Sequence, residues 1–379
     1  MSSHHCKLTI DLDAVADNWR AIRALSAPAI CAAVVKADAY GLGVQRVGPC
    51  LHRAGCRHFF VASFDEARQL RQLLPSTDVQ IYTLAGVFPG DELACVELSI
   101  RPVLVSLEML RRWASVASGT SLPAPSALKL NTGMNRMGLS AADTDTVLEE
   151  SALLQRAQVH LVMSHMACAD EVHSELNEYQ RQIFAGRIRP LQAAKTGLVF
   201  SLANSAATLR GAQYHFDLVR PGIALYGVDP LKSSSVQLRP VVRLALPIIQ
   251  AHPTSPGQWV GYGASYGVDR PGWLLTVAGG YADGLLRSLS NRAHAYFGEH
   301  KVTLAGRVSM DTCTFFYDGD QDCSSLVAGE AQINLLGARQ GLAELAEQAD
   351  TIPYELLTSL GERFGRHYIE AGVHQYVDA

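Results

Sequence analysis

Residues 30–43 read ICAAVVKADAYGLG, an apolar run that ends in Lys36 and passes directly into a segment rich in glycine and small residues. A run that is apolar at nearly every position is typical of a parallel β-strand buried on both faces. A lysine at the carboxyl end of such a strand is held rigidly at the loop-lined mouth where α/β barrels place their chemistry. Residues 30–36 therefore predict a strand, with Lys36 as a candidate nucleophile. The simpler alternative is a strand-end lysine that extends into solvent.

Seven further runs of this kind follow, separated by segments of helical periodicity. They are 58–63, 79–85, 101–105, 127–131, 159–164, 198–203 and 216–220. Eight β-then-α units in about 200 residues predict a (β/α)8 TIM-like barrel of the α/β class. Periodicity alone does not distinguish this barrel from a doubly wound sheet.

Two of the intervening helices have recognisable starts. Ser63-Phe-Asp-Glu66 is the pattern of a capping box, in which a serine and a glutamate three residues apart each bond the other's backbone amide. Ser140-Ala-Ala-Asp143 likewise opens a helix that we expect to run toward Leu154.

Beyond about residue 235 the pattern changes to β-type runs broken by glycine, proline and aspartate. The runs are 241–251, 258–266, 273–279, 294–297, 301–316 and 331–336, and helical patterns return at 342–349 and 354–363. We therefore expect a barrel over 12–234 and a C-terminal, mainly β domain over 235–379. The strand-like stretch 7–11 precedes the barrel, and we assign residues 1–11 to the second domain.

Composition narrows the kinds of partner. The 379 residues are 48% hydrophobic and 18% charged, with a net charge of −4, so the chain has no general attraction for nucleic acid or anionic membranes. The eight cysteines form no C-x-x-C pair, which is typical of a reducing cytoplasm. Neither a signal peptide nor an apolar segment of about 18 residues is evident. We expect a cytoplasmic protein whose partners are small molecules or other proteins.

Polar residues gather where the predicted barrel strands end. They are Lys36, the segment 129–136, His165, Asn204 with Ser205, and the segment 220–223. Each has an ordinary explanation on its own, such as a core histidine, a helix cap or an ion pair. Because the carboxyl ends of parallel barrel strands meet at one face, we expect them to form a single site.

A phosphate group would need hydrogen-bond donors at this face. The Ser205 hydroxyl, the backbone of Gly222 and Ile223 and the Tyr40 hydroxyl are the candidates. The loops after the seventh and eighth strands are the usual phosphate site of barrels. The glycines do not match a dinucleotide fingerprint or a P-loop.

The motifs VKADAYGLG, LKLNTGMNRMG, SHMACADE, LANSAAT, VRPGIALYG, VGYGASYG, GGYADGLLRS and GRVSMD occur in this order along nearly the whole chain. In order and spacing the chain resembles the alanine racemases, enzymes that use pyridoxal 5'-phosphate (PLP) to interconvert L- and D-alanine. The resemblance implies roles for the residues that match. Lys36 would bear the cofactor, Tyr262 would be the opposing base, and Arg220 would contact the pyridine nitrogen.

The resemblance also implies substrate contacts and a partner. Arg136 and the Met310 backbone would hold the substrate carboxylate, with Asp311 in support. Lys129 stands where family members often carry a carbamylated lysine. The family is a head-to-tail homodimer in which each β domain delivers its tyrosine to the other subunit. The narrow entrance would be lined by Tyr281, Arg287, Asp170 and Arg307.

Racemisation explains why two bases are needed. A proton must leave one face of the α-carbon and another must return to the opposite face, which calls for acid–base groups on both sides. Lys36 would serve the D enantiomer and Tyr262 the L enantiomer, with His165 and Arg220 continuing a polar chain from the tyrosine. The product D-alanine would supply peptidoglycan, or the enzyme would serve alanine catabolism.

Three alternatives stay open. A PLP racemase for serine or a longer amino acid would share the same architecture. A non-catalytic PLP-binding protein would have no use for the β domain with Tyr262. A metal-dependent barrel hydrolase would use His165, Asp170 and His173, but these lie on one loop without a second ligand cluster. We therefore expect no metal.

Overall fold

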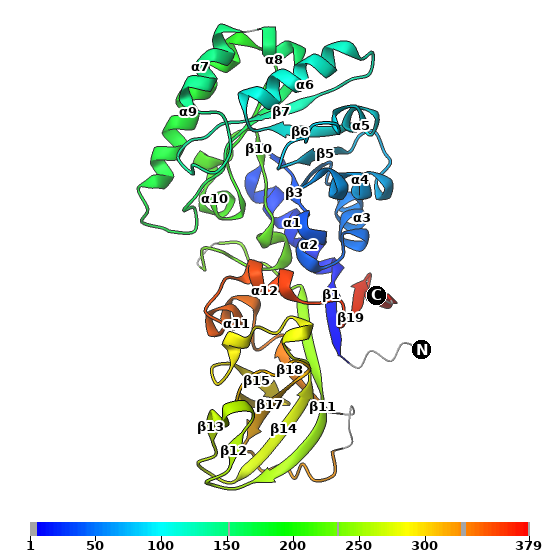
Figure 1. The fold of residues 1–379 in the computed structure, drawn as a ribbon, viewed down its shortest axis with the longest axis vertical. Coiled ribbons are helices and arrows are strands. Elements are labelled where there is room, and N and C mark those ends of the chain that lie inside the picture. The colour runs from blue at the N-terminus through cyan, green and yellow to red at the C-terminus, as the bar shows by residue number, and fades with distance from the viewer. Residues whose placement is uncertain (1–5, 151, 233–234, 327–330, 378–379) are drawn as a thin grey trace. The chain divides into compact units, whose positions relative to one another are not determined.

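A computed structural model of the chain describes residues 6–150, 152–232, 235–326 and 331–377. The chain divides into two compact units (Figure 1). The barrel unit comprises Val15–Ala39 and Gly43–Arg239, and the β unit comprises Met1–Ala14, Tyr40–Leu42 and Pro240–Ala379.

The barrel unit is built on parallel strands. They are β2 (Ile30–Cys31), β3 (Ala33–Val34), β4 (His58–Val61), β5 (Gln80–Thr83), β6 (Ile100–Leu104), β7 (Ser126–Lys129), β8 (Val159–Met163), β9 (Val199–Ser201) and β10 (Leu218–Val219). Strands β3 to β9 pair in chain order, and β10 pairs in parallel with β2. The amides of Asp217 and Arg220 donate to the carbonyls of Phe200 and Ala203, at 2.9 and 3.0 Å, beside β9. These bonds close the circle, so the predicted α/β barrel is confirmed.

The barrel helices are α1 (Leu12–Ser26), α2 (Lys36–Gly41), α3 (Val44–Ala54), α4 (Phe64–Leu73), α5 (Glu92–Glu97), α6 (Leu107–Gly119), α7 (Ala141–Glu149), α8 (Ala152–Arg156), α9 (Leu176–Ala194) and α10 (Ser205–Arg210). Of these, α1 and α2 extend into the residues of the β unit. Helix α6 shows why such segments form helices. Its buried residues Leu110, Trp113, Ala114 and Ala117 recur at helical spacing and cover one face.

The predicted capping box at α4 is only half correct. Ser63 accepts from the Glu66 amide at 3.4 Å, but the Glu66 carboxylate accepts from the amide of Ala62, at 2.7 Å, and from that of Ala37. The box at α7 is reciprocal, since Ser140 and Asp143 each bond the other's amide. This helix ends at Glu149, short of Leu154, which lies in α8.

The β unit contains an antiparallel ring extended on one side. The strands are β1 (Lys7–Asp11), β11 (Val242–Thr254), β12 (Trp259–Val260), β13 (Tyr266–Gly267), β14 (Gly272–Ala278), β15 (His294–Phe297), β16 (His300–Leu304), β17 (Thr312–Tyr317), β18 (Gln332–Leu336), β19 (Gly365–Glu370) and β20 (Val373–Val377). Strand β14 pairs with both β17 and β11, which closes the order β14-β17-β16-β15-β18-β11 on itself. Beyond β11 the sheet continues through β1, β19 and β20. Helices α11 (Leu342–Gln348) and α12 (Pro353–Ser359) precede β19.

Several predicted boundaries in the β unit were wrong. The expected strand 301–316 is two strands, β16 and β17, separated by a loop that contains Met310. The expected strand 258–266 is the short hairpin β12–β13, interrupted by a turn at Tyr262. The expected helix 354–363 ends at Ser359, and β19 and β20 were not anticipated. Strand β1 matches the stretch 7–11 and pairs with β11 and β19.

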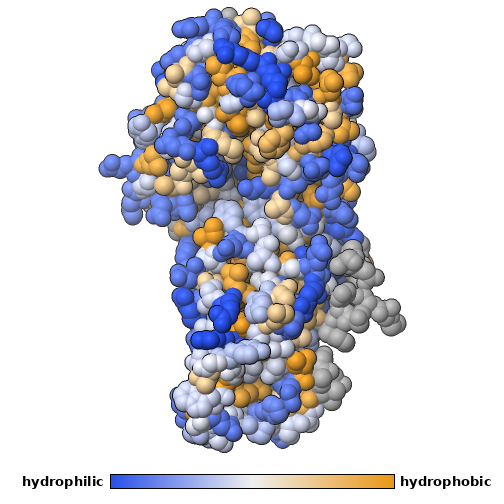
Figure 2. Space-filling view, in the orientation of Figure 1, coloured by the Kyte–Doolittle hydropathy of each residue, from blue (hydrophilic) through white to orange (hydrophobic). Residues whose placement is uncertain are grey.

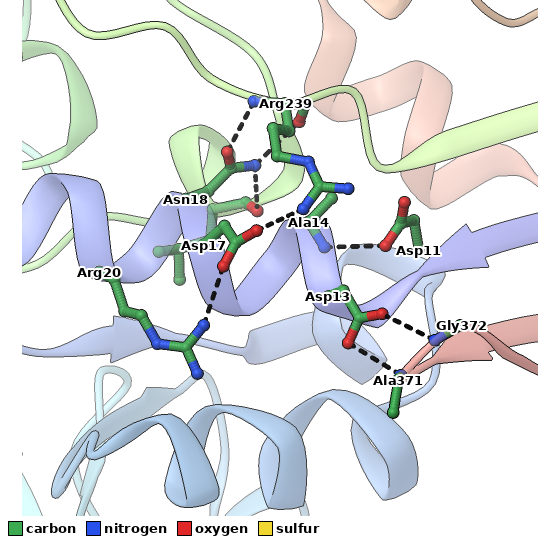
Figure 3. Close-up of polar contacts among 10 residues, drawn as sticks. Asp11, Asp13, Ala14, Asp17, Asn18, Arg20, Arg239, Ala371 and Gly372 are labelled. Atoms are coloured by element: carbon green, nitrogen blue, oxygen red, sulfur yellow. Dashed lines mark hydrogen bonds and ion pairs between the residues drawn. The ribbon is translucent and has the colours of Figure 1, made fainter.

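Polar contacts fasten the start of α1 within each unit (Figure 3). In the β unit, Asp11 accepts from the Ala14 amide at 2.8 Å, the bond of a helix cap, and Asp13 accepts from the amide of Ala371 at 3.0 Å. In the barrel unit, buried Asn18 accepts from the Arg239 amide at 2.7 Å and donates to the carbonyls of Leu225 and Arg239. These bonds define the beginning of the helix without any capping serine.

The outer surface mixes polar and apolar side chains. Figure 2 shows blue and orange patches interspersed over the drawn face, as expected for a chain of small net charge. Among the described residues, no helix combines the length and the apolar character needed to cross a bilayer.

Candidate active site

The backbone after β3 is left-handed rather than merely permissive. Helix α2 begins at Lys36, and φ lies between 52° and 59° at all four residues 37–40, none of which is glycine. Left-handed helical backbone costs an L-residue roughly 1–2 kcal/mol. Strain of this kind collects at functional sites, where the surrounding structure enforces it. The glycine-rich composition had predicted a turn but not this conformation.

Two carboxylates enforce the left-handed turn. Glu66, from α4, accepts from the Ala37 amide at 2.8 Å, and Asp38 accepts from the Val44 amide at 2.7 Å. Together they bind the first turn to the neighbouring strand end and to the start of α3. Glu66 was seen in the sequence only as a capping residue. Its functional part, holding the backbone beside Lys36, could not be read from sequence.

Arg220, directly after β10, is a buried cation held by neutral partners. Its side chain donates to the Ser201 hydroxyl, to the Ser164 carbonyl and, at 3.3 Å, to the Leu202 carbonyl. The residue is 3% exposed, and burial lowers the pKa of its guanidinium to about 9, so it remains charged at neutral pH. No ion pair to a carboxylate is found for it in the described chain. Such a group is suited to donate to a buried neutral acceptor without giving up its proton.

Lys129 closes β7 and lies among cations. It is 5% exposed, and burial lowers the pKa of its ammonium to about 8, with further lowering by Arg220, Arg136 and Lys36. No carboxylate pairs with it in the part of the chain that the structure describes. A buried lysine without a counter-charge is costly in its charged form.

The loop after β7 carries Arg136 out to an exposed position. The chain folds back tightly, because the amides of Leu139 and Asn131 bond the carbonyls of Lys129 and Leu139 at 2.8 and 2.9 Å. Gly138 has φ of 116°, and a Cβ there would lie 2.7 Å from the Leu130 carbonyl carbon, so only glycine fits. Asn131 bonds its own loop, accepting from the amides of Gly133 and Asn135, both at 3.1 Å.

His165 and Lys36 complete the cluster of titratable groups in the barrel. Burial, and then Arg220, lowers the pKa of the His165 imidazole well below its usual value, so the ring is neutral at pH 7. Burial, and then Arg136, lowers the pKa of the Lys36 amine, with Glu66 acting in the opposite direction. Buried Gln180 fixes the His165 backbone by donating to its carbonyl at 2.9 Å. Sequence reasoning missed Gln180, since nothing marks it within an ordinary helical pattern.

The expected phosphate donors meet at the starts of α10 and of the 3-10 turn Ile223–Tyr226. The Ser205 hydroxyl accepts from the amides of Gly222, at 2.8 Å, and Ala224, at 3.3 Å, and keeps its own proton for another acceptor. Asn204 caps α10 by accepting from the Ala207 amide at 3.0 Å. Ser205, Gly222 and Ile223 therefore form one polar corner.

Tyr40 belongs to the β unit by contacts. It is 5% exposed, and its ring centroid lies 6.0 Å from that of Tyr354. Burial raises the pKa of its phenol, which keeps the hydroxyl protonated and able to donate.

Tyr262 lies in a tight, exposed turn of the β unit. The 3-10 turn Tyr262–Ala264 separates β12 from β13, and Tyr262 itself is 71% exposed. Arg307 packs against this turn, because a Cβ at Gly263 would lie 3.0 Å from its guanidinium. Tyr266, the other tyrosine of the hairpin, packs instead on the ring of Phe316 at 6.2 Å. Of the two, Tyr262 is the exposed one and Tyr266 is partly buried.

Two loops bring Tyr281 and Met310 together. The Tyr281 amide donates to the Ser309 carbonyl and the Ala282 amide to the Met310 carbonyl, both at 2.9 Å. Met310 and Tyr281 are 53% and 44% exposed. No hydrogen bond of the Met310 amide is found within the described chain, so this donor is available to a ligand. Of the expected entrance residues, Asp170 lies in the barrel unit, and Arg287 and Arg307 lie in the β unit.

Among the described residues, there is no group of three or more histidine, cysteine, aspartate or glutamate side chains that could hold a metal ion. His165, Asp170 and His173 do not form such a group in this part of the chain. The barrel instead presents amines, a guanidinium and hydroxyls, a donor set suited to an anionic cofactor.

The chain has a parallel barrel, whose strand ends carry a lysine and a buried arginine, and an antiparallel β unit. These features define a class of two-domain, cofactor-binding barrel proteins. Residues 10–230 match the family model of the alanine racemase N-terminal domain, and residues 241–368 match that of the C-terminal domain. The chain belongs to the alanine racemase family.

Individual relatives agree with this assignment. The alanine racemase of Brucella abortus (strain 2308) is 42% identical, over 96% of this chain and 93% of the relative. A protein of Agrobacterium fabrum (strain C58) named as a catabolic alanine racemase is 41% identical, over 97% of this chain and 92% of the relative. Among solved structures, the chain is similar to alanine racemase from Bartonella henselae with covalently bound pyridoxal phosphate. The TM-score is 0.89 at 35% identity, and the match covers 96% of this chain and 99% of that chain.

Proposed function

We propose that this chain interconverts L- and D-alanine with PLP held on Lys36. The observation that carries the proposal is the buried cluster of Lys36, Lys129, His165 and Arg220 at the barrel strand ends, in a chain that matches both alanine racemase domains. The residues fit the cofactor. Arg220 is a buried donor without a carboxylate partner, and Lys36 is an amine of lowered pKa. The Ser205 hydroxyl and the Ile223 amide offer donors for a phosphate, beside the Gly222 amide that already donates to Ser205.

The bound cofactor would supply an electron sink that acidifies the α-proton of the amino acid attached to it. The chain's own groups do the rest. Lys36, whose amine loses its proton more readily than an ordinary lysine, serves as base on one face of the α-carbon. Tyr262 serves the opposite face. Arg220 keeps its proton and therefore donates a hydrogen bond to the pyridine nitrogen without protonating it.

The substrate carboxylate is bound by one cation and one amide. Arg136 is exposed at the tip of the β7 loop, and the Met310 amide lacks a partner in the described chain. A guanidinium and a backbone amide suit a carboxylate as charge-assisted donors. His165 is neutral, so it can accept from Arg220 and pass the polarisation on toward the tyrosine.

We further propose that Lys129 is carbamylated. The neutral amine attacks carbon dioxide, a nitrogen–carbon bond forms, one proton leaves the nitrogen, and the product is an anion. This anion would supply the missing counter-charge to Arg220, Arg136 and Lys36. Because the pKa is about 8, the reactive neutral amine increases as pH rises through that value.

Carbon-13 bicarbonate and NMR test the modification. We expect a carbamate carbon signal that grows as pH rises from about 6.5 to about 8.5 and is absent in Lys129→Gln. A wild-type spectrum without that signal over the same range would contradict carbamylation.

We also propose a homodimer in which Tyr262, Tyr281 and Met310 are covered by a second copy. Their exposures of 71%, 44% and 53% are large for an aromatic or sulfur side chain assigned to a dry site. The barrel would comprise residues 12–234 and the β domain 235–379 with 1–11, as the sequence indicated. All eight cysteines are free thiols, which supports a cytoplasmic enzyme. Supplying D-alanine for peptidoglycan and catabolising alanine are both compatible with this chemistry.

The direct test starts from either enantiomer. Because L- and D-alanine have equal free energy in water, the enzyme should bring both to the same final ratio of about one. Racemisation of serine but not alanine would move the assignment to a related racemase. If PLP is bound and no amino acid is racemised, the protein is a PLP-binding protein and the proposed activity is wrong.

A further inference from the structure

Arg363, in the segment between α12 and β19, joins two carboxylates of the β unit. Its Nε lies 2.9 Å from Asp283 Oδ1, and its Nη1 donates to Asp311 Oδ1 at 2.8 Å. The Asp283 side chain is 6% exposed, whereas those of Arg363 and Asp311 are 53% and 57% exposed. A single guanidinium thus ties a buried carboxylate to a surface one.

The two carboxylates belong to the loops that present Tyr281 and Met310. Asp283 lies two residues after Tyr281, and its second oxygen accepts from the Gly280 amide at 2.8 Å. Asp311 follows Met310 directly, and its carbonyl accepts from the Gly279 amide at 2.8 Å. Arg363 therefore joins the two loops through side-chain ion pairs, in addition to the backbone hydrogen bonds between them.

The two loops are packed so closely that a small shift of one loop would move the other. A Cβ at Gly280 would lie 2.3 Å from the Ser309 carbonyl oxygen, which leaves no room for a side chain. The segment of Arg363 is itself fastened to the first loop, since the Gly361 amide donates to the Asp283 carbonyl at 2.9 Å. The three segments form one bonded cluster, in which Arg363 is the cation that pairs with both carboxylates.

Arginine is the residue suited to this place. Its planar fork presents separate nitrogens to separate carboxylates, which a lysine ammonium does less well. The Arg363–Asp311 pair is exposed and contributes little to folding, whereas the Asp283 carboxylate is buried and gains more from its pairing with Arg363. Stability therefore accounts for the contact with Asp283 but not for the contact with Asp311.

We propose that Arg363 is a positioning residue that sets the spacing between Tyr281 and the Met310 amide, and through it the affinity and the size selectivity for the substrate. This proposal rests on the proposed function, in which the Met310 amide binds the substrate carboxylate. An interaction present with bound substrate and throughout the reaction affects KM more than kcat. Loosening the bridge should also admit a larger side chain beside Tyr281.

The test compares Arg363→Gln with a matched control, Arg270→Gln. Arg270 also lies in the β unit, has a side chain that is 53% exposed, and pairs with Asp318 and Asp269 at 2.8 and 3.1 Å. Four quantities are measured on each holoenzyme: KM and kcat for alanine and serine, the Kd of propionate by calorimetry, and Tm. Propionate is alanine without its amine, so its binding reports the carboxylate site without any reaction.

In Arg363→Gln we expect KM for both alanine enantiomers and the Kd of propionate to rise about 10-fold, with kcat changed less than about threefold. The preference for alanine over serine should fall. Arg363→Lys should recover part of the affinity. If the effect passes through Asp311, removing both side chains should do no more than removing one of them. The double variant Arg363→Gln/Asp311→Asn should then bind propionate at least as tightly as the single variant with the lower affinity. Arg270→Gln should match the wild type in all of these.

Equal propionate affinity in Arg363→Gln and Arg270→Gln would overturn the proposal. So would a fall in Tm that accounts for the lost activity, or a fall in kcat at unchanged KM. Failure of the proposed function looks different, because the wild-type holoenzyme would then racemise no amino acid while propionate binding and Tm remained measurable.

Discussion

The two units present their proposed active-site groups in opposite states. In the barrel unit Arg220, Ser205 and Lys129 are 3%, 4% and 5% exposed. In the β unit Tyr262 and Met310 are 71% and 53% exposed. The barrel groups are thus pre-organised by their own fold, whereas those of the β unit lie on its surface. The cofactor end of the proposed site is thus formed within one chain, whereas the proposed second base, Tyr262, is not covered within its own unit.

The contrast has a simple origin. A parallel barrel brings all its strand ends to one face, and the carbonyls of Ser164 after β8 and Leu202 after β9 already accept hydrogen bonds from Arg220. Tyr262 lies instead between two glycines with φ of 71°, in the loop of a hairpin whose strands have two residues each, and its side chain is exposed to solvent. Changes to the buried barrel groups should therefore affect cofactor binding and chemistry together, whereas the change at Tyr262 should affect chemistry alone.

The largest effect is expected for Lys36→Ala. Removing the cofactor-bearing amine should lower racemisation by at least about 10³-fold. Borohydride reduction and peptide mapping, which should place a pyridoxyl group on Lys36 in the wild type, should find no label in the variant. Lys301→Ala, at an exposed strand residue, is the control and should keep both activity and label. Labelling of Lys129 or Lys301 in the wild type would break the assignment.

Tyr262→Phe should come next, with a loss of about 10²–10⁴-fold. The loss should be one-sided. Solvent-deuterium exchange at the α-carbon should fall more for L-alanine than for D-alanine, because Lys36 still serves the other face. Cofactor binding should not change. Tyr266→Phe, in the same hairpin but packed on Phe316, should lose no comparable activity. Equal loss of exchange for both enantiomers would contradict the assignment of faces.

A moderate effect is expected for Asn204→Ala. Losing the cap of α10 should cost about 0.5–2 kcal/mol of folding stability and weaken PLP binding, because Ser205 is the next residue. Urea unfolding and cofactor titration measure the two. Ser106→Ala removes a similar cap from α6, where Ser106 accepts from the Met109 amide at 3.1 Å. That control should lose stability without losing cofactor affinity; equal weakening in both variants would be evidence against a phosphate corner at α10.

The smallest effect is expected for Asn131→Asp. An aspartate can accept the same two loop amides, and only the donor to Asn135 is lost, so stability should change by less than about 1 kcal/mol. Activity should stay within about twofold. Steady-state kinetics and urea unfolding check this. A large change in activity would mean that residue 131 acts on Lys129 rather than on its own loop.

The sequence was sufficient for an α/β arrangement of parallel strands, because these strands are nearly continuous apolar runs, although such runs do not distinguish a barrel from a doubly wound sheet. It was also sufficient to gather Lys36, Lys129, His165, Ser205 and Arg220 as strand-end residues. Their environment was not predictable. That Ser164, Ser201 and Leu202 satisfy Arg220, or that Glu66 holds the Ala37 amide, depends on three-dimensional neighbours far apart in the chain.

The β unit was harder to read. The stretch 301–316 was interpreted as one strand because β-type residues stand at both of its ends, although Gly306 and Asp311 mark the loop that contains Met310. Tyr262 and Tyr266 were indistinguishable by pattern, and only the resemblance to a family chose between them. Their different packing is set by the bends at Gly261 and Gly263 and by Arg307.

One measurement tests most directly whether the site needs both a barrel from one chain and a tyrosine from another. Lys36→Ala and Tyr262→Phe proteins, each inactive, are mixed and allowed to exchange subunits. Random exchange makes half of the dimers mixed, each with one intact site, so activity should recover to about a quarter of the wild-type value. No recovery, in a mixture shown by mass spectrometry to contain the mixed dimer, would place both residues in one chain's site and contradict the account.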